Sequence, residues 1–163
     1  MDFAKPHKPP RLPGYDYTTP GYYFVTFNTK VRNQNILASI HDVGAAALGG
    51  PVVRLTAAGK IVHELIENIN HVYLDVGVDC YVIMPDHVHL ILVLGCADGP
   101  PRAAVPTPLS RVVNTLKSLA TKRYDEPLWQ DEYYDHIIRN DTDLNEIRAY
   151  IQNNPLKECD SYG

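Results

Sequence analysis

Cysteine is scarce in this sequence of 163 residues, and long apolar runs are missing. The three cysteines, Cys80, Cys96 and Cys159, are widely spaced and form no CxxC pair. This argues against a disulfide framework and against a zinc site built from thiolates. No apolar run approaches the roughly 20 residues of a membrane-spanning helix, and the polar, proline-rich opening lacks the apolar core of a signal peptide. We therefore expect a cytoplasmic protein with no membrane partner.

Positive charge is also scarce, since the formal net charge at pH 7 is −4. Proteins that bind nucleic acids usually show a basic balance or at least a basic patch. Residues 109–124 supply a small patch, because they hold no acid and include Arg111, Lys117, Lys122 and Arg123. A second basic cluster lies near the start of the chain, at Lys5, Lys8 and Arg11. On charge alone, a solvated helix face and a flexible tail explain both clusters.

The length fits one domain with a core of its own. We place this domain at residues 21–163 and expect an extended arm over the proline-rich residues 1–20. Apolar periodicity predicts strands at 21–30, 52–55, 72–85, 87–94 and 128–139, and residues 35–40 fit a further short strand. Helices are predicted from a Thr56 cap to about residue 70, over 109–124, and from an Asp141 cap to Asn154, where Pro155 ends the last one. The order indicates the α+β class, with an antiparallel sheet and helices packed on one face.

The segment YVIMPDHVHLILVL, residues 81–94, places His87 and His89 in an otherwise apolar strand. Side chains at i and i+2 of a strand share a face, so the two imidazoles project together. Two adjacent imidazoles suit one metal ion, although buried histidines often only satisfy backbone groups. A metal site would also need a third ligand. The histidine-triad nucleotide hydrolases carry three alternating histidines, and they are disfavoured because Ile91 stands at the third position.

Tyr150 and Asn154 lie four residues apart in the predicted last helix, so they share a helical face. A tyrosine hydroxyl can attack a phosphodiester, and an asparagine carbonyl oxygen can complete the shell of a hard divalent cation. Taken alone, Tyr150 is more readily explained as a packing residue. Tyr133 and Tyr134 are rival nucleophiles, ranked second because neither is followed at i+4 by an amide on a helix.

Several motifs occur together in one order: RLPGYDYTTPGYYFVTF, MPDHVH, the basic helix, WQDEYYDHIIRN and a final YIQNNP. In this combination the chain resembles the REP-associated tyrosine transposases, a branch of the single-tyrosine HUH transposases of bacteria. The resemblance covers nearly the whole chain and is weakest at residues 31–55 and 95–108. It implies a sheet of ferredoxin-like character in an enzyme that cuts single-stranded DNA with Mg²⁺ or Mn²⁺. The implied products are a 5′-phosphotyrosine bond and a free 3′-hydroxyl that can rejoin strands.

The same resemblance assigns roles to four residues. His87, His89 and Asn154 correspond to the metal ligands, and Tyr150 corresponds to the nucleophile. The implied partners are single-stranded DNA hairpins of REP-like palindromes, bound by a monomer or a homodimer. A domesticated relative that holds such DNA without cutting it is the alternative function. The chain holds no P-loop motif, which agrees with strand rejoining that uses no nucleotide cofactor.

Further side chains are assigned to DNA contact and to positioning. Phosphate neutralisation is expected from the cations of the basic helix, Arg111, Lys117, Lys122 and Arg123. Stacking on unpaired bases is expected from one or more of Tyr15, Tyr17, Tyr22 and Tyr23. His136 or Asp86 could orient the paired histidines through hydrogen bonds, although a turn residue is the simpler interpretation of Asp86.

Overall fold

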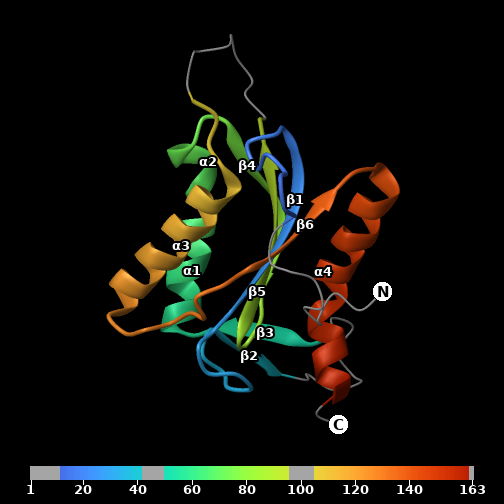
Figure 1. Cartoon of the computed structure of the whole chain (residues 1–163). Helices are drawn as coiled ribbons and strands as arrows, with labels where there is room; N and C mark the ends of the chain where they lie inside the picture. Colours follow the sequence, from blue (N-terminus) through green and yellow to red (C-terminus); the bar gives the residue numbers. More distant parts are fainter. Residues whose placement is uncertain (1–11, 42–49, 96–104, 162–163) are drawn as a thin grey trace.

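A four-stranded antiparallel sheet forms the centre of the molecule, and helices lie against it (Figure 1). The structure is a computed structural model that describes residues 12–41, 50–95 and 105–161, with the side chains of the last helix described as far as Lys157. The strands are β1 Gly21–Asn28, β2 Ala38–His41, β3 Val52–Leu55, β4 Val76–Ile83, β5 His87–Leu94 and β6 Tyr134–Ile138. The helices are α1 Ala57–Glu67, α2 Ile69–Val72, α3 Leu109–Tyr124 and α4 Asp141–Ser161. β2 and β3 form a separate two-stranded sheet.

The connections of the central sheet follow the ferredoxin-like pattern. Its strand order is β4-β5-β1-β6, and each neighbouring pair is antiparallel. Along the chain the order is β1, α1, β4, β5, α3, β6, which is a split βαβ arrangement. Crossovers between parallel strands are almost always right-handed, so α1 and α3 lie on the same face of the sheet. The predicted α+β class and the antiparallel ferredoxin-like sheet are confirmed.

The two faces of the sheet bury different helices, because successive side chains of a strand point to opposite sides. One face, with residues such as Val25 and Leu90, packs against α1 and α3 in the larger core. The opposite face, with Phe24 and Ile91, packs against Ile147 and its neighbours on α4. Helices therefore cover both faces rather than the single face predicted (Figure 1). The crossover rule fixes α1 and α3, whereas α4 follows the last strand and folds back over the free face.

An ion pair and apolar contacts fix α4 to the sheet. Arg148 donates from Nε and Nη2 to the two carboxylate oxygens of Asp79 in β4, at 2.8 and 2.5 Å. Ile147 and Ile151 are buried in the cluster beneath the helix, with 0% and 2% of their surface exposed. Because these residues bracket Tyr150 in the sequence, they determine where its side chain lies.

The predicted start of α1 is confirmed in detail. Thr56 is the N-cap, and its Oγ1 accepts the amide of Gly59 at 3.1 Å. The strands predicted at 21–30, 52–55 and 87–94 and the helix predicted at 109–124 are present, and the short strand at 35–40 forms as β2.

Two predicted strands are longer than the observed ones. The strand predicted at 72–85 begins only at Val76, because residues 69–72 form the short helix α2. Val72 and Leu74, which supported the earlier start, are 60% and 75% exposed. The strand predicted at 128–139 is shortened to β6, and Trp129 instead forms an isolated bridge with Thr29.

The start of α4 lies one residue away from the predicted position. Asn140 provides the cap, since its Oδ1 accepts the amide of Asp143 at 2.8 Å. Asp141 is the first helical residue instead of the predicted cap.

The end of α4 also differs, because Pro155 lies inside the helix and does not stop it. A proline removes one helical hydrogen bond. The extension past Pro155 brings Leu156 against Gly50, and α4 also contacts β2.

Part of the predicted N-terminal arm is folded. Residues 12–20 form turns, and Tyr15 and Tyr17 pack against Tyr23 with ring centroids 6.4 and 6.2 Å away. The domain boundary at residue 20 stays a prediction. The basic cluster at residues 5–11 and most of the 95–108 loop lie outside the described residues. None of the helices in the described segments is both long and apolar enough to cross a membrane.

The Asp79–Arg148 pair yields a stability prediction. Asp79→Asn should lower the free energy of unfolding by about 1.5 to 3 kcal/mol at neutral pH, the usual range for a hydrogen bond to a charged group. The hydrogen bond from Arg148 is the main reason that the pKa of Asp79 lies below 3.8. The stabilisation is therefore present above that ordinary value and is lost as the pH falls through the lower folded-state pKa.

Glu64→Gln is the matched control for this prediction. The Arg123–Glu64 pair is 3.6 Å long, with side chains 50% and 69% exposed, and exposed pairs contribute about 0 to 1 kcal/mol. Urea unfolding of both variants across acid and neutral pH makes the comparison. Equal losses for the two variants at every pH would contradict the role given to Arg148.

Candidate active site

His87 and His89 lie side by side on β5, on the sheet face that α4 covers. β5 pairs with β1, so His89 stands opposite Thr26 and His87 stands opposite Asn28. The two histidines are 9% and 2% exposed, and their ring centroids are 4.7 Å apart. The strand geometry predicted for the pair is confirmed.

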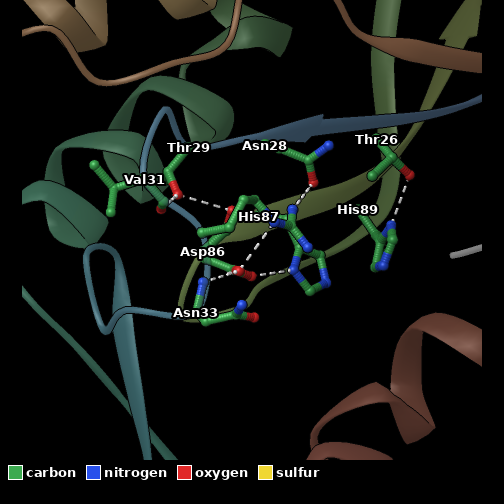
Figure 2. A network of polar contacts seen from close by, with 9 residues as sticks. Thr26, Asn28, Thr29, Val31, Asn33, Asp86, His87 and His89 are labelled. Carbon is green, nitrogen blue, oxygen red and sulfur yellow. Dashed lines mark hydrogen bonds and ion pairs between the residues drawn. The ribbon is translucent and has the colours of Figure 1, made fainter.

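A hydrogen bond at Nδ1 orients each histidine ring (Figure 2). His87 Nδ1 lies 2.7 Å from Oδ1 of Asp86, and His89 Nδ1 lies 2.7 Å from Oγ1 of Thr26. Neither Nε2 atom makes a hydrogen bond to any residue in the described part of the chain. A histidine that ligates a metal typically uses its second ring nitrogen for such an orienting contact, so both Nε2 atoms are suited to ligation.

Asp86 is itself held from several sides. Its Oδ2 accepts the amide of Asn33 at 2.8 Å (Figure 2). The same oxygen pairs with Nε of Arg32 at 3.2 Å. Burial alone would raise the pKa of Asp86, but the hydrogen bonds from His87 and Asn33 and the nearby positive charges lower it overall. Asp86 therefore faces His87 as a carboxylate. It is a positioning residue as well as a turn residue.

Burial keeps His89 neutral. The pKa of His89 lies well below its ordinary value of 6.5, first because the ring is buried and then because of electrostatic interactions with His87 and Arg32. The neutral imidazole is the form that binds metal ions.

α4 brings Tyr150 to the histidines within one chain. The Tyr150 ring centroid is 5.3 Å from that of His89 and 6.3 Å from that of Phe24. Asn154 lies one helical turn further on, with only 5% of its surface exposed. The Tyr150 ring therefore lies beside one of the paired histidines, His89, and Asn154 is buried on the same face of the helix.

Two cations beside this cluster were missed by the sequence analysis. Arg32 pairs with Asp86 and donates from Nη1 to Asn28, which stands opposite His87. Lys157 places its ammonium group 5.0 Å from the ring centroid of Tyr150. The sequence signal for Lys157 was hidden because Pro155 was expected to end the helix. Arg32 lies in the segment where the sequence motifs are weakest.

The rival residues occupy other positions. Tyr133 is 9% exposed and belongs to the core on the α1 and α3 side. Tyr134 shares the sheet face of the histidines, where it stands opposite Thr26. Nε2 of His136 is 2.9 Å from Oδ2 of Asp143 at the start of α4. Of the two predicted orienting residues, Asp86 is therefore the one whose contact with a paired histidine is observed.

The cations predicted to contact DNA lie on α3, which packs on the sheet face opposite to α4 (Figure 1). His89 is on the α4 face, where its ring stacks on Phe24. Arg111 and Lys122 are exposed, and Arg123 lies 3.6 Å from Glu64. These three remain predicted DNA contacts.

Lys117 requires a correction. It is 8% exposed, and its Nζ donates to the carbonyls of Gln130, Asp131 and Glu132 at 2.7, 3.0 and 3.4 Å. Its position falls on the inward face of α3, so the ammonium group ties this helix to the segment before β6. The predicted phosphate contact of Lys117 is wrong.

The tyrosines proposed for base stacking also differ in access. Tyr23 is fully buried, and its hydroxyl donates to the carbonyl of Thr19 at 2.6 Å. Tyr15 and Tyr17 are half-buried against it. Tyr22 is half-buried on the α4 side. Tyr23 is therefore unavailable for stacking on a base.

A metal ion at this site would need a mixed set of ligands. Within the described ranges there is no group of three or more His, Cys, Asp or Glu side chains that could hold a metal. The donors that the fold brings to this face are two imidazoles and, on α4, a buried carboxamide.

Comparisons with known proteins support the fold. No family model matches the sequence. An uncharacterized protein of Haemophilus influenzae is 30% identical over 164 residues, covering 90% of this chain and 86% of that protein. A solved REP-associated tyrosine transposase bound to a REP hairpin has a TM-score of 0.64 at 21% identity, covering 88% of this chain and 72% of that chain. A Deinococcus radiodurans protein provisionally assigned to the transposases reaches a TM-score of 0.42 at 21% identity, covering 88% and 95%, which is too low to support a conclusion. The resemblance to the REP-associated tyrosine transposases is confirmed at the level of the fold.

The correction for Lys117 can be tested against Lys122. Lys117→Met should lower the free energy of unfolding by about 1 to 3 kcal/mol, because buried carbonyls lose a charged donor. Lys122→Met should leave stability within about 0.5 kcal/mol, as is usual for an exposed site. Chemical unfolding measures both variants. A neutral Lys117→Met would show that its ammonium group is not structural.

Proposed function

We propose that this chain, which belongs to one family with the Haemophilus influenzae protein and has the fold of a REP-associated tyrosine transposase, cleaves and rejoins single-stranded DNA. The substrates are hairpin-forming repeats. Tyr150 is the nucleophile, and His87, His89 and Asn154 hold a divalent cation. The observation that carries the proposal is the 5.3 Å separation of the Tyr150 and His89 rings within one chain.

The residues at the site can supply ligands to a divalent cation. Both histidines hold Nδ1 in a hydrogen bond, which leaves Nε2 as the ligand atom, and burial keeps His89 neutral. The carboxamide of Asn154 supplies an oxygen donor, which Mg²⁺ and Mn²⁺ prefer. Bound there, the cation would draw charge from the phosphate oxygens as the transition state forms.

The chain's own residues account for the covalent steps. The Tyr150 oxygen bonds to phosphorus as the bond from phosphorus to the 3′ oxygen breaks. The phenol proton passes to solvent, and the leaving 3′ oxygen takes up a proton. The 5′-phosphotyrosine ester keeps the energy of the broken bond, so attack by a 3′-hydroxyl can reverse the reaction without a nucleotide cofactor.

Packing holds Tyr150 ready for this attack. Phe24 contacts both the Tyr150 ring, at 6.3 Å between centroids, and the His89 ring, at 5.4 Å. The Arg148–Asp79 pair fixes the same turn of α4 to β4. A nucleophile that packing already holds in position loses less conformational entropy when it reacts, and this lowers the activation free energy.

Tyr150→Phe tests the nucleophile. The probe is a pool of single-stranded DNA hairpins with randomised flanks, incubated with Mn²⁺ and resolved on denaturing gels. Wild-type protein should form covalent adducts, and Tyr150→Phe should form none while binding the pool with affinity within about twofold, since only the attacking oxygen is lost.

Tyr134→Phe is the matched control, because Tyr134 lies on the same sheet face. It should keep forming adducts. Adducts that persist in Tyr150→Phe and vanish in Tyr134→Phe would assign the nucleophile to β6. Tight binding by the wild type with no adduct in Mn²⁺ would instead identify a non-cleaving DNA-binding protein.

Thr26→Val tests the orientation of His89. Valine keeps the size of threonine but removes the hydrogen bond to Nδ1, and losses of such contacts typically weaken metal binding by about 10- to 100-fold. Mn²⁺ titration followed by electron paramagnetic resonance of the free ion measures the effect. Thr121→Val on α3 should leave the affinity unchanged, and an unchanged affinity in Thr26→Val would remove Thr26 from the metal site.

A further inference from the structure

Two cations stand beside the row formed by His87, His89 and Tyr150, each next to a different member of it. Neighbouring rings of the row are in contact, with centroids 4.7 Å apart between the histidines and 5.3 Å apart between His89 and Tyr150. Arg32 contacts Asp86, the hydrogen-bond partner of His87. Lys157 lies over the ring of Tyr150.

Arg32 is held in place but stays accessible. Its Nε pairs with Asp86, and its Nη1 donates to Asn28. The side chain remains 43% exposed, so the guanidinium group is fixed on one edge and open to solvent elsewhere. A planar guanidinium group can offer its remaining N–H donors to phosphate oxygens.

Lys157 is placed by the extension of α4 past Pro155. It is exposed, and it follows Tyr150 by two helical turns and Asn154 by three residues. Its ammonium group lies over the ring of the proposed nucleophile, at 5.0 Å from the centroid. An exposed lysine acts as a mobile point charge, which suits a phosphate whose position changes during a reaction.

We propose that Arg32 and Lys157 bind backbone phosphates of the DNA single strand as it crosses the row of His87, His89 and Tyr150. Arg32 holds the strand on the His87 side, and Lys157 holds it beside Tyr150. The inference rests on the proposed function. It places the main phosphate contacts of the single strand on the sheet face that α4 covers, whereas the sequence analysis expected phosphate contacts on α3.

The salt dependence of DNA binding tests this inference. The probe is the same hairpin pool, bound in Mn²⁺ by proteins that all carry Tyr150→Phe so that no DNA is consumed. For single strands, the slope of log affinity against log salt changes by about 0.7 for each phosphate contact. Arg32→Gln and Lys157→Gln should each reduce the slope by about that amount, with a several-fold loss of affinity.

Matched variants separate charge from structure. Lys60→Gln removes an exposed cation from α1 on the other side of the sheet and should leave the slope unchanged. Arg32→Lys keeps the charge and should keep the slope even if loss of the fixed edge lowers the melting temperature. A slope unchanged in either Arg32→Gln or Lys157→Gln overturns the proposal.

The experiments can show separately whether the phosphate contacts and the cleavage reaction are correct. If the slopes fall but the chain with Tyr150 intact forms no adducts, the phosphate contacts stand and the cleavage reaction fails. If adducts form but the slopes do not change, the reaction stands and the two cations serve only to position Asp86 and Tyr150.

Discussion

Helix α4 reaches the two histidines because contacts on both sides of Tyr150 fix it to the sheet. The ferredoxin-like crossovers place α1 and α3 on one face and leave the other face for a segment that follows β6. Isolated helices are marginal in water, so α4 depends on what it packs against. Ile147 and Ile151 supply the apolar contact, and Arg148 supplies a directional one through its two hydrogen bonds to Asp79. A shift of the helix along the sheet would break this ion pair and would also move the Tyr150 ring relative to His89.

The same burial that packs this face also prepares the histidines. A buried imidazole resists protonation, which keeps His89 in the form that can ligate a cation. Burial would equally favour a neutral Asp86, but its carboxylate accepts the Asn33 amide and pairs with Arg32 and His87. The network therefore fixes one ring through a charged partner and the other through the neutral hydroxyl of Thr26. His87 and His89 therefore differ in their hydrogen-bond partners, although both lie on the same face of β5.

Local pattern was enough to predict most of the fold, and tertiary packing decided the rest. Strand alternation placed His87 and His89 on one face, and helical spacing joined Tyr150 to Asn154. The register that sets Thr26 opposite His89 depends on pairing between strands 63 residues apart, which no local pattern contains. Lys117 was misassigned because charge was given more weight than its place on the inward face of α3. The last turns of α4, which include Lys157, were not predicted because Pro155 was expected to end the helix. The contact of Leu156 with Gly50 depends on tertiary packing and cannot be read from the local sequence.

An acidic chain can still attract DNA at one face, because salt screens charge over short distances. At physiological ionic strength the screening length is about 8 Å, so acids on the far side of the sheet have little influence on a phosphate at the histidines. The charges that matter most are those next to His87, His89 and Tyr150. Arg32 pairs with Asp86, the partner of His87, and Lys157 lies over the Tyr150 ring. Asp86 is only 5% exposed, and His87, Asn33 and Arg32 already engage its carboxylate. The net charge of −4 therefore describes the chain as a whole and not the surface that a DNA strand would meet.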